Sequence, residues 1–222
     1  MLPTPEVAAD DRVYEPSEDS FLLLDCFEQS LEQLQQTYKN PVVCEIGSGS
    51  GVVTAFLKMH VFPKALFLAT DLNPTACSTV LSTIKKNEPE VPKAGVVSVL
   101  QMSLAEGIRK NSIDILVFNP PYVPAEEVPE VPKTDEDYTW LDLALLGGSD
   151  GMVVTWQLLD RLDEYLTPNG VAYILFCARN KPDEVAKVME SRGWTVETVI
   201  HRKAGWEVLS VLSFRKDSQG SI

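Results

Sequence analysis

The apolar residues of this chain follow two alternating patterns. Short uninterrupted apolar runs predict strands at 41–46, 65–69, 96–101, 113–118 and 171–177. Between these runs, apolar positions three or four residues apart predict helices at 17–38, 52–59, 74–87, 151–165 and from Pro182 onward, with an irregular loop at 88–93. Because strands that alternate with helices build βαβ units, we expect a mostly parallel sheet with helices on both faces.

Two more apolar runs close the chain, at 195–201 and 208–214, and a short turn joins them. A connection this short makes an antiparallel pair, since a parallel crossover needs about a dozen residues or more. The expected α/β fold therefore has a mostly parallel seven-stranded sheet that ends in a C-terminal antiparallel hairpin. We predict one domain, in which an N-terminal extension and helix (1–40) precede a Rossmann-like core (41–222) with a long loop at 123–140.

Composition and charge narrow the class of protein. The 222 residues are 45% hydrophobic, enough for one sizeable core, and no apolar stretch reaches the roughly 20 residues that span a bilayer. The N-terminus lacks a basic-then-apolar leader, so we expect a soluble protein of the cytoplasm, with the nucleus as a second compartment. The net charge of −13 opposes binding to nucleic-acid phosphates. Cys26, Cys44, Cys77 and Cys177 lack metal-ligand spacing, so we expect reduced core residues and no metal site.

A glycine-rich turn follows the first predicted strand. Gly47, Gly49 and Gly51 stand where the buried run changes to helical spacing, and glycines let a backbone pass close to a ligand. Glu45 would repel the phosphates of a dinucleotide but suits a cationic amino-acid or sulfonium ligand. Asp71 ends the next predicted strand, where a carboxylate can accept hydrogen bonds from both ribose hydroxyls. These residues favour S-adenosyl-L-methionine as cofactor; a purely structural glycine turn is the alternative.

The predicted strand at 113–118 is followed by Asn119, Pro120, Pro121 and Tyr122, at the end of the strand where open α/β sheets bind ligands. The Asn119 side-chain carbonyl and the Pro120 main-chain carbonyl can both accept hydrogen bonds from one NH2 group, which fixes the plane of that group. The two prolines hold the carbonyls rigidly, and the Tyr122 ring can stack on a flat substrate. We predict that this segment catalyses methyl transfer to a planar amide or amine nitrogen; a strand simply ended by prolines is the alternative.

With both motifs in place, the chain resembles the HemK-like N5-glutamine methyltransferases, specifically the eukaryotic branch that modifies the translation termination factor. The resemblance extends to 13–25 (VYEPSEDSFLLLD), 143–151 (LALLGGSDG) and 203–207 (KAGWE). It implies a class I methyltransferase fold, S-adenosylmethionine as cofactor and, as substrate, the glutamine of a Gly-Gly-Gln motif in the eukaryotic peptide chain release factor. It also implies cofactor or substrate contacts at Ser20, Glu45, Gly47, Asp71 and Asn119.

One position departs from the family pattern. The family usually has an acidic residue after the third strand, which contacts the adenine amino group, whereas this chain has Met102-Ser103-Leu104. We expect Ser103 and Leu104 at the cofactor, with a weaker adenine contact. The resemblance further implies a small zinc-binding activator subunit as partner. The apolar strand at 96–100 suits strand addition by that subunit, and coverage by the chain's own helices and loops is the alternative.

The loop at 123–140 leaves its role open. It carries six acidic residues against one lysine, which fits either a solvated loop or contact with a basic segment of a protein substrate. Three other functions compete with glutamine methylation. Methylation of adenine N6 in DNA or RNA needs the same Asn-Pro-Pro-Tyr geometry but conflicts with the negative charge. Asn119 and Glu45 oppose a noncatalytic scaffold, and the glycine spacing opposes a nicotinamide dehydrogenase.

Overall fold

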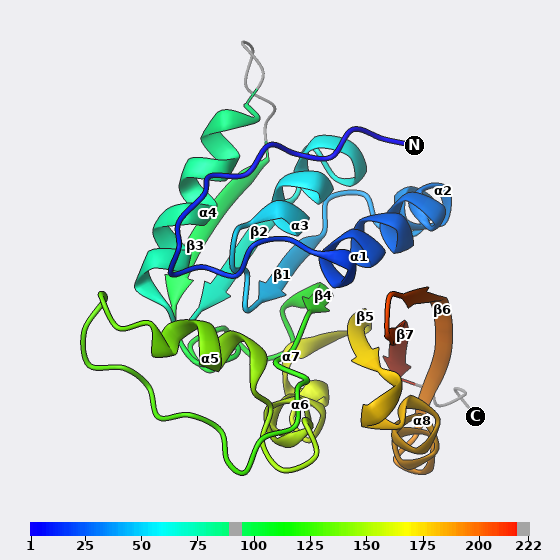
Figure 1. The fold of residues 1–222 in the computed structure, drawn as a ribbon. Helices are drawn as coiled ribbons and strands as arrows, with labels where there is room; N and C mark the ends of the chain where they lie inside the picture. Colours follow the sequence, from blue (N-terminus) through cyan, green and yellow to red (C-terminus); the bar gives the residue numbers. More distant parts are fainter. Residues whose placement is uncertain (89–94, 217–222) are drawn as a thin grey trace.

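The strands form one seven-stranded sheet in the order β3-β2-β1-β4-β5-β7-β6 (Figure 1). The computed structural model describes residues 1–88 and 95–216, so the loop expected at 88–93 lies outside the described residues except at its first position. The strands are β1 (Val42–Ile46), β2 (Leu66–Asp71), β3 (Val96–Gln101), β4 (Ile113–Phe118), β5 (Leu166–Cys177), β6 (Trp194–Ala204) and β7 (Glu207–Lys216). The first five are parallel, and β7 is antiparallel to both β5 and β6. Both the mostly parallel sheet and the terminal hairpin are confirmed.

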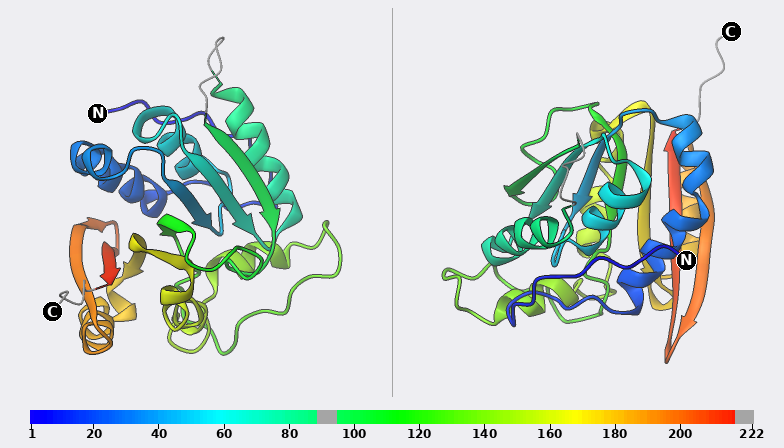
Figure 2. Two further views of the ribbon diagram at one scale, coloured as in Figure 1. Left: turned by 180° about the vertical axis from the view of Figure 1, so that it is seen from behind. Right: turned by 90° about the horizontal axis from the view of Figure 1, so that it is seen from above.

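Helices cover both faces of this sheet (Figure 2). One face carries α1 (Glu18–Gln29), α2 (Leu31–Thr37), α3 (Val52–Phe56), the π-helical turn η1 (Leu57–Val61) and α4 (Pro74–Lys86). The other face carries α6 (Val153–Leu159), α7 (Leu162–Tyr165) and α8 (Pro182–Ser191). The remaining helices are α5 (Thr139–Leu145) and the 3-10 turn η2 (Ala178–Asn180). None of the helices in the described part of the chain is long and apolar enough to cross a bilayer.

The central strands divide their side chains between two cores. Ile115 and Val117 of β4 belong to the core under α1 and α3, whereas Leu116 and Phe118 belong to the core under α6, α7 and α8. Because both faces of β4 are buried, its sequence is an almost continuous apolar run and shows no alternation with polar residues. This double burial explains why β1 and β4 could be predicted within about one residue.

Three helices that the sequence predicts as continuous are interrupted. The helix expected at 17–38 ends at Gln29 and restarts as α2 at Leu31, because the backbone of Ser30 between them leaves the helical conformation (φ −90°, ψ 1°). The helix expected at 151–165 is divided into α6 and α7 by Asp160 and Arg161. The helix expected at 52–59 passes from α3 into η1. Apolar spacing persists across each break because both parts bury the same face, so spacing reports burial and not hydrogen-bond continuity.

The residues just ahead of the fifth predicted strand, 167–170, lie inside β5. The ladder between β4 and β5 passes from the Ile113–Leu166 pair to the Ile115–Val171 pair, so residues 167–170 form an irregularity in the strand. Pro168 and Gly170 lie in this irregularity, where the pairing is interrupted locally. The strand β5 itself begins at Leu166, five residues before the predicted strand at 171–177.

The segment ahead of α1 runs along α4 toward the carboxyl ends of the parallel strands (Figure 1). Near its start, the Ala8 amide donates to Thr83 Oγ1 at 2.9 Å. Near its end, the Arg12 carbonyl accepts from Asn73 Nδ2 at 2.9 Å. This part of the N-terminal extension thus reaches the edge of the sheet where the candidate site residues lie.

Candidate active site

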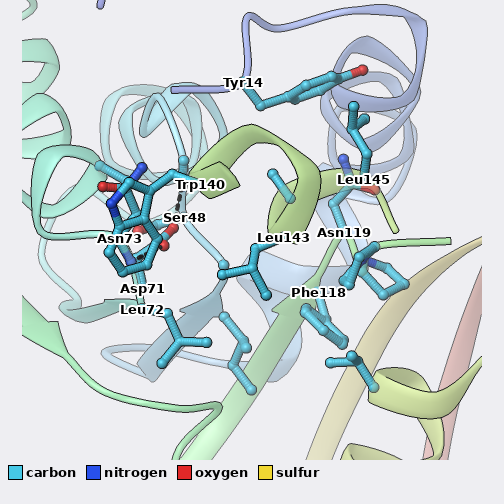
Figure 3. Close-up of a pocket in the computed structure, with 18 of the residues that line it drawn as sticks. Tyr14, Ser48, Asp71, Leu72, Asn73, Phe118, Asn119, Trp140, Leu143 and Leu145 are labelled. Atoms are coloured by element: carbon cyan, nitrogen blue, oxygen red, sulfur yellow. Dashed lines mark hydrogen bonds between the residues drawn. The ribbon is translucent and has the colours of Figure 1, made fainter. Parts of the chain in front are cut away.

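The glycine turn and the Asn-Pro-Pro-Tyr segment meet at the carboxyl ends of two neighbouring strands. In the parallel pair β1 and β4, Ile46 lies opposite Phe118, so Gly47 and Asn119 follow side by side. Both line one cavity of about 250 Å³. Figure 3 shows Asp71, Asn73 and Trp140 together at one end of this cavity and Asn119 toward the other. The two motifs that the sequence predicts to act together therefore share one site.

The turn after β1 depends on left-handed backbone. Gly47 and Gly49 have φ angles of +62° and +50°, a region that L side chains rarely adopt. The turn is fixed at its centre, because the Gly49 amide donates to Asp71 Oδ2 at 2.9 Å. Gly51 also has a positive φ, yet it does not line the cavity: a Cβ there would lie 3.0 Å from Cα of Val80. The structure thus gives Gly51 a packing role between α3 and α4, and its contact with the cofactor stays a prediction.

Asp71 is held by main-chain donors from two directions. Its Oδ2 accepts from Gly49, and its Oδ1 accepts from the Asn73 amide at 2.9 Å. Burial raises the pKa of this carboxyl, and the amide hydrogen bonds partly offset that rise. The carboxylate is thus fixed at the end of β2 beside the turn, where the sequence analysis expects a partner for ribose hydroxyls.

Glu45 is a buried carboxyl on the floor of the cavity. Its Oε2 accepts from the Thr54 amide at 2.8 Å and from the Thr54 hydroxyl. Burial nevertheless raises its pKa to about 8, because these two hydrogen bonds compensate only part of the desolvation. A cationic ligand in the cavity would supply the missing compensation, which agrees with the chemistry that the sequence suggested for this position.

Asn119 is oriented by a carboxylate that the sequence analysis did not assign. Its Nδ2 donates to Oδ2 of Asp19, in the first turn of α1, at 2.9 Å, and Asp19 is only 4% exposed. This hydrogen bond settles which way the amide faces, so Oδ1 of Asn119 is the free acceptor. That oxygen is buried and has no hydrogen-bond partner among the described residues. A buried acceptor without a hydrogen-bond partner lowers the stability of the folded protein, and a substrate NH2 group would supply the missing hydrogen bond.

Two tyrosines border the same corner. The Tyr14 hydroxyl donates to Oδ1 of Asp19 at 3.3 Å, and burial raises the Tyr14 pKa to about 12. The Tyr122 hydroxyl donates to Oε2 of Glu207, at the start of β7, at 3.2 Å. Burial, with the nearby Asp19 and Glu207 carboxylates, raises the Tyr122 pKa well above its ordinary value, so this phenol is a hydrogen-bond donor and not a base.

The segment at 143–151 holds the corner in place from behind. A Cβ at Gly151 would lie 2.1 Å from the Tyr122 carbonyl oxygen, and one at Gly147 would lie 2.2 Å from that of Pro121. The same Tyr122 oxygen accepts from Asn180 Nδ2 at 3.0 Å. Glycine is therefore required because the two backbones touch, which gives a physical reason for this part of the resemblance.

The other predicted site residues also lie at the cavity. Its lining includes Ser20, Ser103, Leu104, Pro120 and Pro121, together with the predicted residues Glu45, Gly47, Gly49, Asp71, Asn119 and Tyr122. Asp19, Asn73 and Trp140 also line the cavity, although their sequence context does not predict a role in the site. Asp19 stands inside the segment at 13–25, where its acidic side chain reads as an ordinary first-turn helix residue, and only its contact with Asn119, 100 positions away, reveals its role.

Fold and site together define a class I methyltransferase. The structure is similar to a chain of the E. cuniculi Mtq2-Trm112 complex, with a TM-score of 0.66, 26% sequence identity, and coverage of 93% of this chain and 99% of that one. That complex is described as responsible for methylation of the eRF1 translation termination factor.

Sequence relatives narrow the class to a family. Residues 18–131 match the model of the methyltransferase small domain. The chain is 39% identical over 206 residues to methyltransferase HEMK2 of Mus musculus, covering 92% of this chain and 90% of the relative. It is 38% identical over 208 residues to the eRF1 methyltransferase catalytic subunit mtq2 of Schizosaccharomyces pombe, covering 90% and 87%. The chain belongs to the methyltransferase small domain family and is an enzyme of the HemK-like glutamine methyltransferase group, as the resemblance implied.

Proposed function

We propose that this methyltransferase uses S-adenosylmethionine to methylate the side-chain amide nitrogen of the glutamine in the Gly-Gly-Gln motif of the eukaryotic peptide chain release factor. One observation carries the proposal: Asn119 offers a buried, unpartnered Oδ1 in the same cavity as the glycine turn. An amide NH2 is the group that such an acceptor requires. The relatives named for eRF1 methylation support the choice of protein substrate.

The residues of the cavity fit the proposed cofactor. Glu45 is a buried carboxyl without a cationic partner among the described residues, and it suits the positive end of S-adenosylmethionine. Asp71 stands at the other end of the glycine turn, as a nucleoside ribose requires. When bound, the cofactor supplies an already activated methyl group, so the protein needs to orient the acceptor nitrogen and does not need a strong base.

The chain's own residues perform that orientation. Asp19 keeps the Asn119 NH2 occupied, which directs Asn119 Oδ1 toward the substrate amide. Hydrogen bonding of the substrate N–H groups to Asn119 and to the Pro120 carbonyl fixes the amide plane and disperses positive charge as the nitrogen is alkylated. The rigid prolines and the backbone contacts of Gly147 and Gly151 keep these oxygens in place.

The test is transfer of a labelled methyl group to purified release factor. We expect labelling of the wild-type factor, no labelling when its Gly-Gly-Gln glutamine is replaced, and loss of nearly all labelling with the Asn119→Ala enzyme. Labelling that persists on the glutamine-replaced factor would overturn the proposed substrate. An adenine-containing DNA or RNA duplex serves as a competing acceptor in the same assay, and the net charge of −13 leads us to expect none of the label there.

We further propose that a small zinc-binding activator pairs with β3. The E. cuniculi neighbour is a complex with Trm112, and β3 is an edge strand here. Its residues 96–100 carry no charge, and Val96 is 57% exposed. The opposite edge, β6, exposes polar and charged residues, namely Glu197, Thr198, His201 and Lys203. Charged edges resist pairing, so β3 is the edge suited to strand addition.

A matched pair of edge variants tests this proposal. Val96→Lys places a charge on β3, and Thr198→Lys places the same charge on β6. We expect Val96→Lys to reduce co-purification with the activator at least tenfold and Thr198→Lys to leave it unchanged. Equal co-purification of both variants would assign the activator to another surface.

A further inference from the structure

Trp140 is a buried aromatic residue. Among the described residues, it belongs to none of the apolar core clusters. It is 4% exposed, and it lies in the first turn of α5. The three core clusters are built from other residues. The indole instead lines the candidate site, together with Leu143 of the same helix and Val128 and Val131 of the preceding loop. Its burial therefore comes from the loop at 123–140 and from the cavity wall.

The loop fixes the orientation of the indole. Its Nε1–H donates to the Thr134 carbonyl at 3.0 Å, so the polar edge of the ring is already satisfied. Asp137 Oδ1 accepts from the Thr139 amide at 2.9 Å and so sets the start of the helix that carries Trp140. With the ring N–H used by the loop itself, the indole offers a ligand in the cavity only its apolar faces.

The indole stands at the end of the cavity that a nucleoside would occupy. Trp140, Asp71 and Asn73 line the same cavity, and all three lie on the same side of the view in Figure 3. The N-terminal segment ties the loop to this end, because Arg12 donates from Nη1 to the Asp135 carbonyl at 3.4 Å while its own carbonyl accepts from Asn73. The lining of the cavity also includes Leu72, Met102, Ser103 and Leu104.

We propose that Trp140 is a binding residue for the adenosine of the cofactor, which it covers by stacking, so that the loop at 123–140 is part of the cofactor site. This inference rests on the proposed use of S-adenosylmethionine. It also gives a physical account of Ser103, which stands where the family usually has an acidic residue. Stacking on an aromatic ring supplies affinity for a base without any polar contact to its amino group.

Binding of the product S-adenosylhomocysteine tests the proposal without requiring catalysis. Titration calorimetry compares the wild type with Trp140→Leu, which removes the aromatic ring, and Trp140→Phe, which keeps one. We expect the Kd to rise roughly tenfold in Trp140→Leu, the order of one base–aromatic stack, and less than about threefold in Trp140→Phe. The Kd for adenosine alone should rise by the same factor in each variant, because Trp140 contacts only the adenosine half of the ligand.

Tryptophan fluorescence gives a second readout. Stacking should quench Trp140, so we expect saturating ligand to lower the emission of the wild type and of Trp206→Phe. The matched control Trp206 is 99% exposed at the tip of the β6–β7 hairpin. In Trp140→Phe the ligand-dependent quenching should disappear. Because this variant keeps an aromatic ring, its signal decides the question even if Trp140→Leu folds poorly.

The outcomes separate this inference from the proposed function. Unchanged Kd values in a folded Trp140→Leu, or quenching that persists in Trp140→Phe, would overturn the role of Trp140 while the cofactor site stands. A wild-type chain that binds no S-adenosylhomocysteine would instead overturn the proposed cofactor.

Discussion

At the scale of single residues, the reaction centre depends on the pair Asp19 and Asn119. Replacing Asp19 with Asn offers Asn119 a side chain that can donate as well as accept, so the Asn119 amide is no longer held in one orientation. We expect kcat to fall about 10- to 100-fold, the range typical of a misplaced catalytic group, with the Kd for S-adenosylhomocysteine within about threefold of wild type. Initial rates and calorimetry measure the two quantities.

Tyr14→Phe is the control for this prediction. It removes the hydroxyl bonded to the other oxygen of Asp19 and leaves the hydrogen bond to Asn119 intact. We expect its kcat to remain within about threefold of wild type. Equal falls in kcat in Tyr14→Phe and Asp19→Asn would show that Asp19 does not act by orienting Asn119. The same conclusion would follow if the Kd of Asp19→Asn for S-adenosylhomocysteine rose enough to account for its whole loss of activity.

Glu45 leads to a prediction about pH. Its pKa in the folded protein is about 8, against an ordinary value of 4.5, so between these values the folded state holds a proton that the unfolded chain has released. The free energy of unfolding must therefore fall as the pH rises from about 4.5 to about 8. One pKa unit is worth about 1.4 kcal/mol, or about 3–6 °C in a chain of this size.

We accordingly expect the Tm of the ligand-free wild type to drop by at least about 3 °C relative to Glu45→Gln between pH 5 and pH 8. Thermal melts of both proteins across that range measure the difference. Because other titrating groups are common to both proteins, parallel Tm curves would contradict the raised pKa.

The contrast between Asn119 and Asp19 shows how far a sequence predicts a site. Asn119 stands in a short motif with chemistry of its own, so it could be predicted together with Glu45 and Asp71. Asp19 acquires its role only when α1 packs beside the end of β4. Trp140 likewise reads as a residue of an acidic loop, and only the folded loop places it in the cavity that Asp71 lines. Local motifs are visible in a sequence, whereas partners supplied by distant elements are not.

At the scale of elements, the backbone of the Asn-Pro-Pro-Tyr corner requires Gly151. Gly151→Ala would bring a Cβ to 2.1 Å from the Tyr122 carbonyl oxygen at a φ of +72°. Gly193→Ala is a matched control, because its φ is +84° but no atom lies within 4 Å of the added Cβ. We expect the control to cost about 1 kcal/mol of stability and to retain its activity, since only backbone strain is added.

For Gly151→Ala we expect a loss of more than about 2 kcal/mol and a fall of more than about tenfold in the activity of the folded fraction, because the corner itself must shift. Urea unfolding and methyl-transfer rates measure the two effects. Comparable stability and activity in the two variants would show that the backbone contact is unimportant.

The predictability of the elements follows from their burial. Strands β3 and β4 were predicted at their observed bounds because each is a compact apolar run between polar residues. The helix breaks at Ser30 and at Asp160 were not predicted, since a change of hydrogen-bond partner leaves the apolar spacing intact. The order of the strands in the sheet was not predicted either, because which parallel strands become neighbours depends on where each crossover helix packs.

At the scale of the whole molecule, exposed negative charge is concentrated in the loop at 123–140, which also lines the site. The loop at 123–140 exposes Glu126, Glu127, Glu130, Asp135 and Glu136 in a chain whose net charge is −13. If the loop contacts a basic segment of the protein substrate, its negative charge attracts that segment. If the loop is only solvated, its charge has no effect on the KM for the substrate. Exposed charges are screened over about 10 Å at 0.1 M salt, so any such attraction must weaken as salt is added.

We therefore expect the triple reversal Glu126→Lys, Glu127→Lys and Glu130→Lys to raise the KM for the release factor at least about fivefold, with the Kd for S-adenosylhomocysteine unchanged. The control reverses Asp183, Glu184 and Glu190 on α8, which changes the net charge by the same amount on a helix apart from the loop (Figure 1). A rise in KM confined to the loop variant, and a wild-type KM that increases with salt, would identify local attraction. Equal shifts in both variants would assign the effect to net charge alone, and unchanged kinetics would leave the loop with no electrostatic part in choosing the substrate.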